Sequence, residues 1–356
     1  MRPRPTATRS SAAAIAGDPW PRFARDLVGA AALLGLGVVA FVAALDPYGL
    51  RAAPGLPPGP IVDANQRLSY PQIARGGPFD SAVFGTSTAR LLDPQHLDAA
   101  LGGRFANLSV NAATPDEQLR LAALFLDRRP LRAALFALDA TWCAAYPPAR
   151  TANAFPDWLY EPGTPGLASG AVLRQANLRG VSAAVQAGTV RLGLARPRIR
   201  PDGYAVFTPP ESAYDPARAG AYIHEGAADP AGPAEPVAAP MPALDRLDAT
   251  LRAMPRDAIK IIAFMPVHAA AQAPPGTPAA LREAACKARV ARIGSGRGAV
   301  VVDFRLASSL TTRDANYWDA LHYRVPVAAQ VVAGLAAAVA TGADDPGGVY
   351  RVLAHP

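Results

Sequence analysis

The chain has 356 residues, of which 51% are apolar, and a formal net charge of +7. This length can form one large domain or two ordinary ones, and the apolar content excludes an intrinsically disordered protein. The positive charge comes almost entirely from dispersed arginines, because Lys260 and Lys287 are the only lysines. Without a basic block or a recognisable nucleic-acid module, we expect no nucleic-acid partner.

The first feature in chain order is a charge-free apolar run over residues 27–45, which follows an arginine-containing tail over residues 1–26. Nineteen residues at helical rise cover roughly 28 Å, close to the thickness of a bilayer core. A signal peptide cleaved near Ala44 is the alternative, but the apolar run is longer than a typical signal core. We therefore predict an uncleaved transmembrane helix. Five arginines precede it, which predicts a cytoplasmic tail and residues 46–356 on the other side of the membrane.

Residues 46–77 are rich in proline and glycine, and the run 54–60 cannot form regular structure because proline fixes φ and lacks a backbone donor. We predict a linker there, and a folded domain over residues 78–356.

In that domain, short apolar runs bounded by turn or charged residues alternate with helical patterns. Such runs are typical of buried parallel strands. The predicted strands are 80–85, 104–110, 133–139, 259–265 and 299–304. The predicted helices are 115–126, 243–254, 278–293 and 325–340. The alternation predicts an α/β fold with a doubly wound parallel sheet of about five strands.

A long insertion, about 146–240, separates the third and fourth strands. We expect two helices in it, roughly 166–178 and 181–195, and a lid over the carboxyl edge of the sheet. Its aromatic residues would stack on sugar rings or form the small core of the lid. They are Trp158, Tyr160, Tyr204, Tyr214 and Tyr222.

The cysteines, Cys143 and Cys286, show no zinc-binding spacing. A single disulfide would fit an exported domain. Two unpaired buried thiols are the simpler interpretation, and we adopt it.

A serine, Ser87, follows the first predicted strand in Gly85-Thr-Ser87, at the sheet edge where α/β proteins bind ligands. Serine is a weak nucleophile unless a base activates it and a third group orients that base. Asp319 and His322, just before the last helix, could supply both functions. The alternative is that Asp319 caps that helix and His322 packs on its first turn.

Three segments, residues 85–87, 107–114 and 319–322, resemble the motifs of the SGNH/GDSL esterase superfamily. The resemblance covers roughly residues 79–145 and 255–342. It implies a flavodoxin-like sheet and a triad of Ser87 as nucleophile, His322 as base and Asp319 as orienting carboxylate. Ala112 stands where the family usually has an oxyanion-hole glycine, so only its backbone N–H could serve.

The chain departs from the family pattern in two places. Thr86 stands where an aspartate is usual, and the third block, 137–142, lacks the usual oxyanion asparagine. Asp139 cannot donate there when ionised. Losing such a donor typically costs on the order of 3 kcal/mol of transition-state stabilisation. Either Asn111, Thr141 or another donor substitutes, or the site is slow, inactive or built only for binding.

Two further residues are candidates for the same site. His268 follows the fourth predicted strand at the same edge, where it would line the site or serve as a hydrogen-bonded structural histidine. Arg90 would bind an anionic substrate group or pair with a carboxylate, and we favour the structural role.

Membrane-anchored members of this superfamily often act on acyl groups of envelope polysaccharides. By that resemblance we expect a single-pass bacterial inner-membrane protein with a periplasmic domain that acts as an acyl esterase or O-acetyltransferase on carbohydrate esters. This mechanism needs no metal or organic cofactor. The alternatives are a catalytically impaired binding or assembly module, and a partner of a multispanning acyltransferase.

Overall fold

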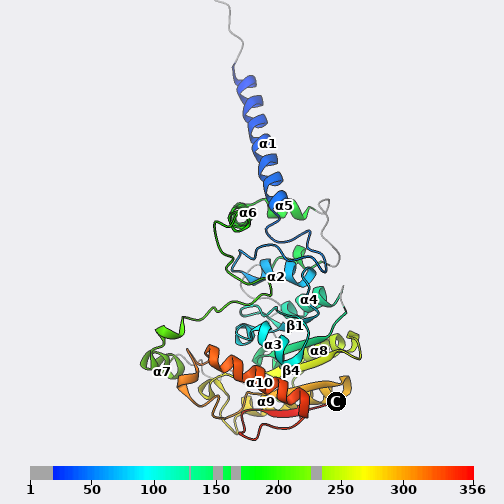
Figure 1. Cartoon of the computed structure of the whole chain (residues 1–356), viewed down its shortest axis with the longest axis vertical. Coiled ribbons are helices and arrows are strands. Elements are labelled where there is room, and N and C mark those ends of the chain that lie inside the picture. Colours follow the sequence, from blue (N-terminus) through cyan, green and yellow to red (C-terminus); the bar gives the residue numbers. More distant parts are fainter. Residues whose placement is uncertain (1–18, 128–129, 147–154, 162–169, 226–234) are drawn as a thin grey trace, which may run out of the picture.

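A six-stranded sheet forms the centre of the computed structural model, which describes residues 19–127, 130–146, 155–161, 170–225 and 235–356 (Figure 1). Its strand order is β2-β1-β3-β4-β5-β6. The strands are β1 (Ser81–Phe84), β2 (Phe105–Asn107), β3 (Ala133–Leu138), β4 (Ile259–Phe264), β5 (Ala299–Asp303) and β6 (Arg351–Ala354). The first five strands are parallel and β6 is antiparallel to β5. All five predicted strand runs form strands, but the predicted count was one short because β6 was not expected.

Helices cover both faces of the sheet. On one face α4 (Pro115–Leu126), α8 (Pro242–Ala253) and α9 (Pro278–Arg297) pack with Phe84 and Phe136 in one apolar cluster. On the other face α3 (Pro94–Leu101) and α10 (Val325–Thr341) pack with Val83 and Leu135. Successive strand residues point to opposite faces, so a strand covered on both sides must be apolar throughout. This explains why the strands were readable as continuous apolar runs.

The chain also forms short 3-10 helices in its connections. Within the described residues they are η1 (Ser87–Ala89), η2 (Ala140–Cys143), η3 (Asp157–Leu159), η5 (Glu211–Ala213), η6 (Ala269–Ala271) and η7 (Asp314–Asn316).

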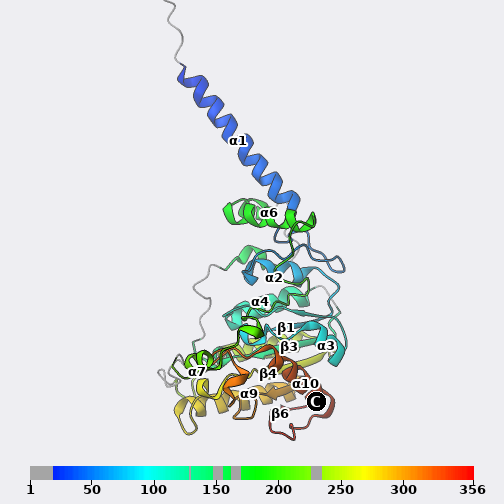
Figure 2. The same ribbon diagram turned by 60° about the vertical axis from the view of Figure 1, so that its left-hand side comes forward.

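The N-terminal helix α1 (Trp20–Leu45) is long and apolar enough to cross a membrane, and it projects from one end of the domain (Figures 1 and 2). It begins within the predicted tail, of which residues 1–18 lie outside the described part of the chain. Its side chains are exposed along most of its length, but Val42 in its last turns is fully buried in the core of the domain.

The prediction of a linker over 46–77 was wrong. This segment contains α2 (Gln66–Arg75), and Tyr48, Leu50 and Ile61 are buried in the core. The prolines do prevent regular structure over 54–60, but irregular backbone can still pack when its side chains are apolar. Residues 46–77 are therefore part of the domain.

The insertion is only partly the lid that was expected. Its helices α5 (Ala171–Gln175) and α6 (Leu178–Arg191) lie beside the end of α1, not over the carboxyl edge of the sheet (Figure 2). Its later part, with η5 and α7 (Pro216–His224), packs on the last loop before α10. Residues 147–154, 162–169 and 226–234 of the insertion lie outside the described residues.

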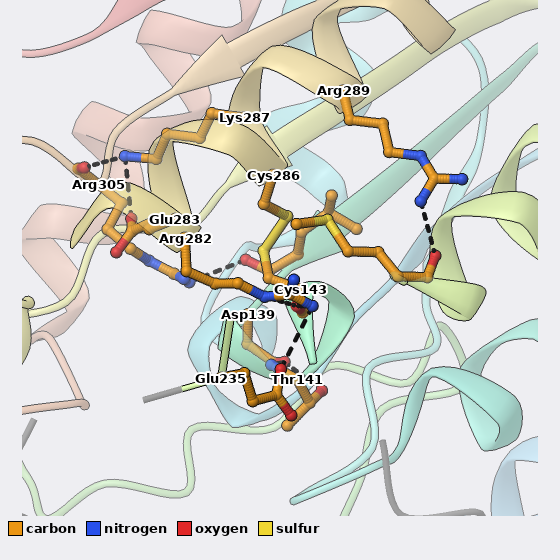
Figure 3. Close-up of a disulfide and its surroundings, with 12 residues drawn as sticks. Asp139, Thr141, Cys143, Glu235, Arg282, Glu283, Cys286, Lys287, Arg289 and Arg305 are labelled. Atoms are coloured by element: carbon orange, nitrogen blue, oxygen red, sulfur yellow. Dashed lines mark hydrogen bonds and ion pairs between the residues drawn. A yellow bond between two sulfur atoms is a disulfide. The ribbon is translucent and has the colours of Figure 1, made fainter. Parts of the chain in front are cut away.

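The prediction of two free thiols was also wrong, because Cys143 and Cys286 form a disulfide (Figure 3). Cys143 ends η2 after β3, and Cys286 lies on α9, which covers the same face of the sheet. Their separation of 143 residues in sequence gave no sign of this contact. The Arg282 guanidinium donates to the Cys143 carbonyl at 2.9 Å and fixes η2 on α9 beside the bond.

Candidate active site

The turn after β1 carries Ser87 and requires a glycine at Gly85. A Cβ built on Gly85 would lie 2.9 Å from the Cβ of Ala137 on β3 and 3.0 Å from that of Ala89. Only a residue without a side chain lets the backbone turn this close to the neighbouring strand. Ser87 therefore begins η1 directly at the carboxyl end of the sheet.

Buried side chains from other elements fix the backbone after Ser87. The Tyr323 hydroxyl, from the loop before α10, donates to the Thr88 carbonyl. The Asn107 amide, at the end of β2, donates to the carbonyls of Ala89 and Leu92, both at 2.9 Å. The Ser87 turn is thus tied to the second strand and to the last loop.

The His322 ring lies within hydrogen-bond distance of Ser87 on one side and of Asp319 on the other. The Ser87 Oγ is 2.9 Å from Nε2 of His322, and Nδ1 of His322 is 2.8 Å from Oδ2 of Asp319. With Nδ1 protonated toward the carboxylate, Nε2 is free to accept the serine proton. The structure therefore brings together, from the two ends of the domain, the three residues that the motifs singled out.

Backbone N–H groups position the Asp319 carboxylate and favour its ionised form. Oδ1 accepts the N–H groups of Leu321 at 2.8 Å and His322 at 2.9 Å. Burial by itself would raise the pKa of Asp319, but the His322 ring and these two N–H donors outweigh burial and lower the pKa below its ordinary value. Asp319 is consequently an anion at neutral pH, as an orienting carboxylate must be.

A loop from β2 to α4 runs beside the Ser87 turn. The Val110 N–H donates to the Gly85 carbonyl at 3.0 Å, and Ala112 adopts a left-handed φ of +48°. This φ is typical of glycine, which is the residue that the resemblance expects at this position. Within the described residues, the backbone N–H groups of Ser87 and Ala112 have no hydrogen-bond acceptor.

Arg67, a residue of α2 that the sequence did not single out, supports this loop. Its guanidinium donates to the carbonyls of Asn111 at 3.1 Å and Ala112 at 3.2 Å. It also forms a buried ion pair with Glu117 of α4, in which both side chains are at most 3% exposed. Arg67 thereby sets the positions of residues 111 and 112.

Arg90 is buried beside the triad and forms no ion pair within the described part of the chain, contrary to the expected carboxylate partner. Its Nη1 donates to the side-chain oxygen of Asn111 at 3.0 Å, and its guanidinium lies 4.5 Å from the ring centre of Phe207. Phe207 in turn meets the His322 ring edge-on, with 5.6 Å between ring centres. The insertion therefore does contribute one wall of the site, through Phe207.

Thr141 is not joined to the triad. Its N–H and its hydroxyl both donate to Oδ1 of Asp139, at 2.9 and 2.5 Å. Figure 3 shows both residues in the group of side chains around the disulfide. The third block thus forms the turn η2, in which the Thr141 hydroxyl already donates to Asp139.

His268 supports the last loop and makes no contact with Ser87. Its backbone N–H donates to the Ala320 carbonyl at 2.9 Å, and its Nε2 lies 3.2 Å from Asp314, which also contacts His224 at 2.9 Å. Burial lowers the pKa of His268. Of the two roles considered from the sequence, this geometry corresponds to the structural one.

A cavity of about 240 Å³ opens beside Asp319, between the last loop and α7. Its wall includes Trp318 from the loop and Arg218 and Tyr222 from the insertion. The Tyr214 ring packs edge-on against Trp318, with 5.3 Å between ring centres. The cavity therefore combines two aromatic side chains with the Arg218 cation and the carboxylates of Asp215 and Asp319.

No protein-family model, no curated protein and no solved structure matches this chain. The chemistry of the site is therefore inferred from its own residues. Arg67, Phe207 and Tyr323 were missed from the sequence because each acts through a contact with a residue more than 40 positions away.

Proposed function

We propose that this chain is a serine-dependent acyl esterase or O-acyltransferase of the SGNH type. The observation that carries the proposal is the continuous hydrogen-bonded series from Ser87 through His322 to Asp319. The order of the five parallel strands, β2-β1-β3-β4-β5, is the flavodoxin-like order, which supports the resemblance.

In this mechanism Ser87 Oγ attacks the carbonyl carbon of an ester while His322 Nε2 takes the hydroxyl proton. The tetrahedral oxyanion accepts hydrogen bonds from the backbone N–H groups of Ser87 and Ala112. The carbon–oxygen bond to the alcohol then breaks, and the imidazolium returns the proton to the leaving alcohol. His322 Nε2 next takes the proton of water or of an acceptor hydroxyl as that oxygen attacks the acyl-Ser87 carbonyl. The bond between the acyl carbon and Ser87 Oγ then breaks and the imidazolium gives its proton to Oγ, which releases a free acid or a new ester and restores Ser87.

The alcohol part of the substrate would occupy the cavity beside Asp319. Trp318 and Tyr222 offer aromatic faces of the kind that stack on sugar rings, which supports a carbohydrate ester as the substrate.

We place the catalytic domain on the periplasmic side of a bacterial inner membrane, anchored by α1. Two features support this placement. Five arginines precede the charge-free run over residues 27–45, and the Cys143–Cys286 disulfide is typical of an oxidising compartment. The test is a reporter that works only in the cytoplasm, fused after Pro356. Activity of this reporter would overturn the orientation.

The test uses the full chain in detergent, because truncation at residue 60 would remove the buried Tyr48 and Leu50. We expect a fluorophosphonate probe to label the wild type and the control Ser182→Ala, an exposed serine of α6, but not Ser87→Ala. The wild type and Ser182→Ala should also hydrolyse p-nitrophenyl acetate, whereas Ser87→Ala should not. Labelling of Ser87→Ala equal to that of the wild type would refute the assignment of Ser87 as the nucleophile.

The second candidate is a binding or assembly module that keeps the fold without fast chemistry. The missing third-block asparagine favours it, because Thr141 is engaged with Asp139. An unlabelled wild type that still binds acetylated polysaccharide would support this candidate over the enzyme.

A further inference from the structure

The insertion's helix α6 carries apolar side chains on two opposite sides. One side, with Ala183, Ala184 and Ala187, is buried against the domain. Residues Leu178, Val185 and Leu192 recur every seven positions at and just beyond the helix, so they share one side, roughly 150° from the centre of the buried side. They are 92%, 50% and 75% exposed. A helix on the surface of a soluble domain normally has polar residues there.

The same segment is strongly basic. Residues 171–200 contain six arginines and no aspartate or glutamate. Arg179 and Arg200 pair with acids elsewhere in the domain, whereas Arg196 and Arg198 are exposed and form no ion pair within the described residues. Another exposed leucine, Leu194, lies between these arginines and the helix. Exposed leucines with uncompensated arginines are typical of helices that lie on anionic lipid.

The position of α6 relative to α1 identifies the surface that it would meet. Gly188 of α6 lies against the Leu45 side chain, where a Cβ would be 3.6 Å from Leu45 Cδ1. Arg191 donates to the Leu45 carbonyl at 2.7 Å. Figures 1 and 2 show α6 at the end of the domain from which α1 projects, running across the direction of α1.

We propose that α6 and residues 192–198 lie in the interface of the bilayer that α1 crosses. Leu178, Val185 and Leu192 enter the boundary between headgroups and acyl chains, and Arg196 and Arg198 bind lipid phosphates. The bilayer is the occupant because the apolar and basic surface is continuous with the point where α1 leaves the domain. This inference rests on the proposed membrane anchoring by α1.

Each test variant gains one tryptophan in the full chain and is reconstituted in phosphatidylcholine–phosphatidylglycerol vesicles with brominated acyl chains. Leu192→Trp reports on the proposed interface. Leu281→Trp, on α9 at the opposite end of the domain and 55% exposed, is the matched control, and Leu33→Trp in α1 reports the anchor. The wild-type signal is subtracted for the native tryptophans.

We expect bromine to quench the introduced tryptophan at positions 192 and 33 but not at position 281. Quenching at 192 no greater than at 281, with position 33 quenched, would refute the interfacial helix and leave the anchor standing. That outcome would indicate a protein partner or a second copy on this surface. Absence of quenching at position 33 would refute the anchor itself.

The proposed binding of Arg196 and Arg198 to lipid phosphates is tested separately. With Leu192→Trp in place, replacing phosphatidylglycerol by phosphatidylcholine should reduce the quenching. Adding Arg196→Gln and Arg198→Gln should abolish this dependence on lipid charge. If the double substitution leaves the dependence unchanged, the assignment of these arginines to lipid phosphate is wrong.

Discussion

Substitution of Arg67 tests the support of the site most directly. Arg67→Met removes two hydrogen bonds to Glu117 and two to the carbonyls of Asn111 and Ala112, all between 2.7 and 3.2 Å. It leaves the Glu117 carboxylate buried without its cation. Breaking a buried ion pair on one side typically costs about 3–5 kcal/mol, so we expect that loss in the free energy of unfolding.

The assay is urea unfolding of the full chain in detergent, with labelling by the fluorophosphonate probe as the second readout. Removing both partners, as in Arg67→Met with Glu117→Leu, should cost less than the sum of the single changes by about 1–3 kcal/mol. Because Ala112 would lose its support, labelling should slow by up to about 100-fold. Additive losses, or a loss below about 1 kcal/mol for Arg67→Met, would refute the reasoning.

Three further changes follow from the structure. Gly85→Ala should destabilise the fold by about 1–3 kcal/mol and slow labelling, because the added Cβ would meet Ala137 of β3. The control Gly296→Ala adds a Cβ with no atom within 4 Å, so it should cause neither effect. Urea unfolding measures the stability of both variants. Replacing Cys143 and Cys286 by serine opens a 143-residue loop and should cost up to about 5 kcal/mol, measured against the wild type in denaturant; equal stability under oxidising conditions would contradict the disulfide. The pKa of Asp319 is lower in the folded state, so its contribution to the free energy of unfolding is complete above its unfolded pKa of about 3.9 and is lost as the pH falls through the folded pKa. Asp319→Asn should therefore weaken the fall of the free energy of unfolding at acidic pH, and it should slow labelling. An unchanged pH dependence of stability would argue against the assignment.

The parts of the fold that the sequence predicted well are those with a local signal. The helix Pro115–Leu126 was predicted to the residue because proline and acids open it, and Thr114 and Glu117 form a capping box at its start. Ser87, Asp319 and His322 were recognisable because short motifs at the carboxyl edge carry them. In both cases the physical cause lies within a few residues of its effect.

The missed features depend on contacts between distant segments. Helix α2 contains Pro71 and buries polar residues, among them Arg67 and Gln72, so it lacks an apolar helical period. Its side chains are buried because they pack against other elements, and those elements are invisible in the local pattern. Strand β6 has only four residues, of which only Ala354 is buried, so it too lacked the apolar run of the other strands.

The reassignment of residues 46–77 changes how the site relates to the membrane. A linker would let the domain move freely relative to α1. Instead, Val42 of α1 and Tyr48 share one apolar core with α2, and Arg67 of α2 holds the carbonyl of Ala112. Packed contacts therefore run without interruption from the end of α1 to the loop beside Ser87. Because protein interiors deform little, we expect the site to keep a nearly constant position relative to the end of α1.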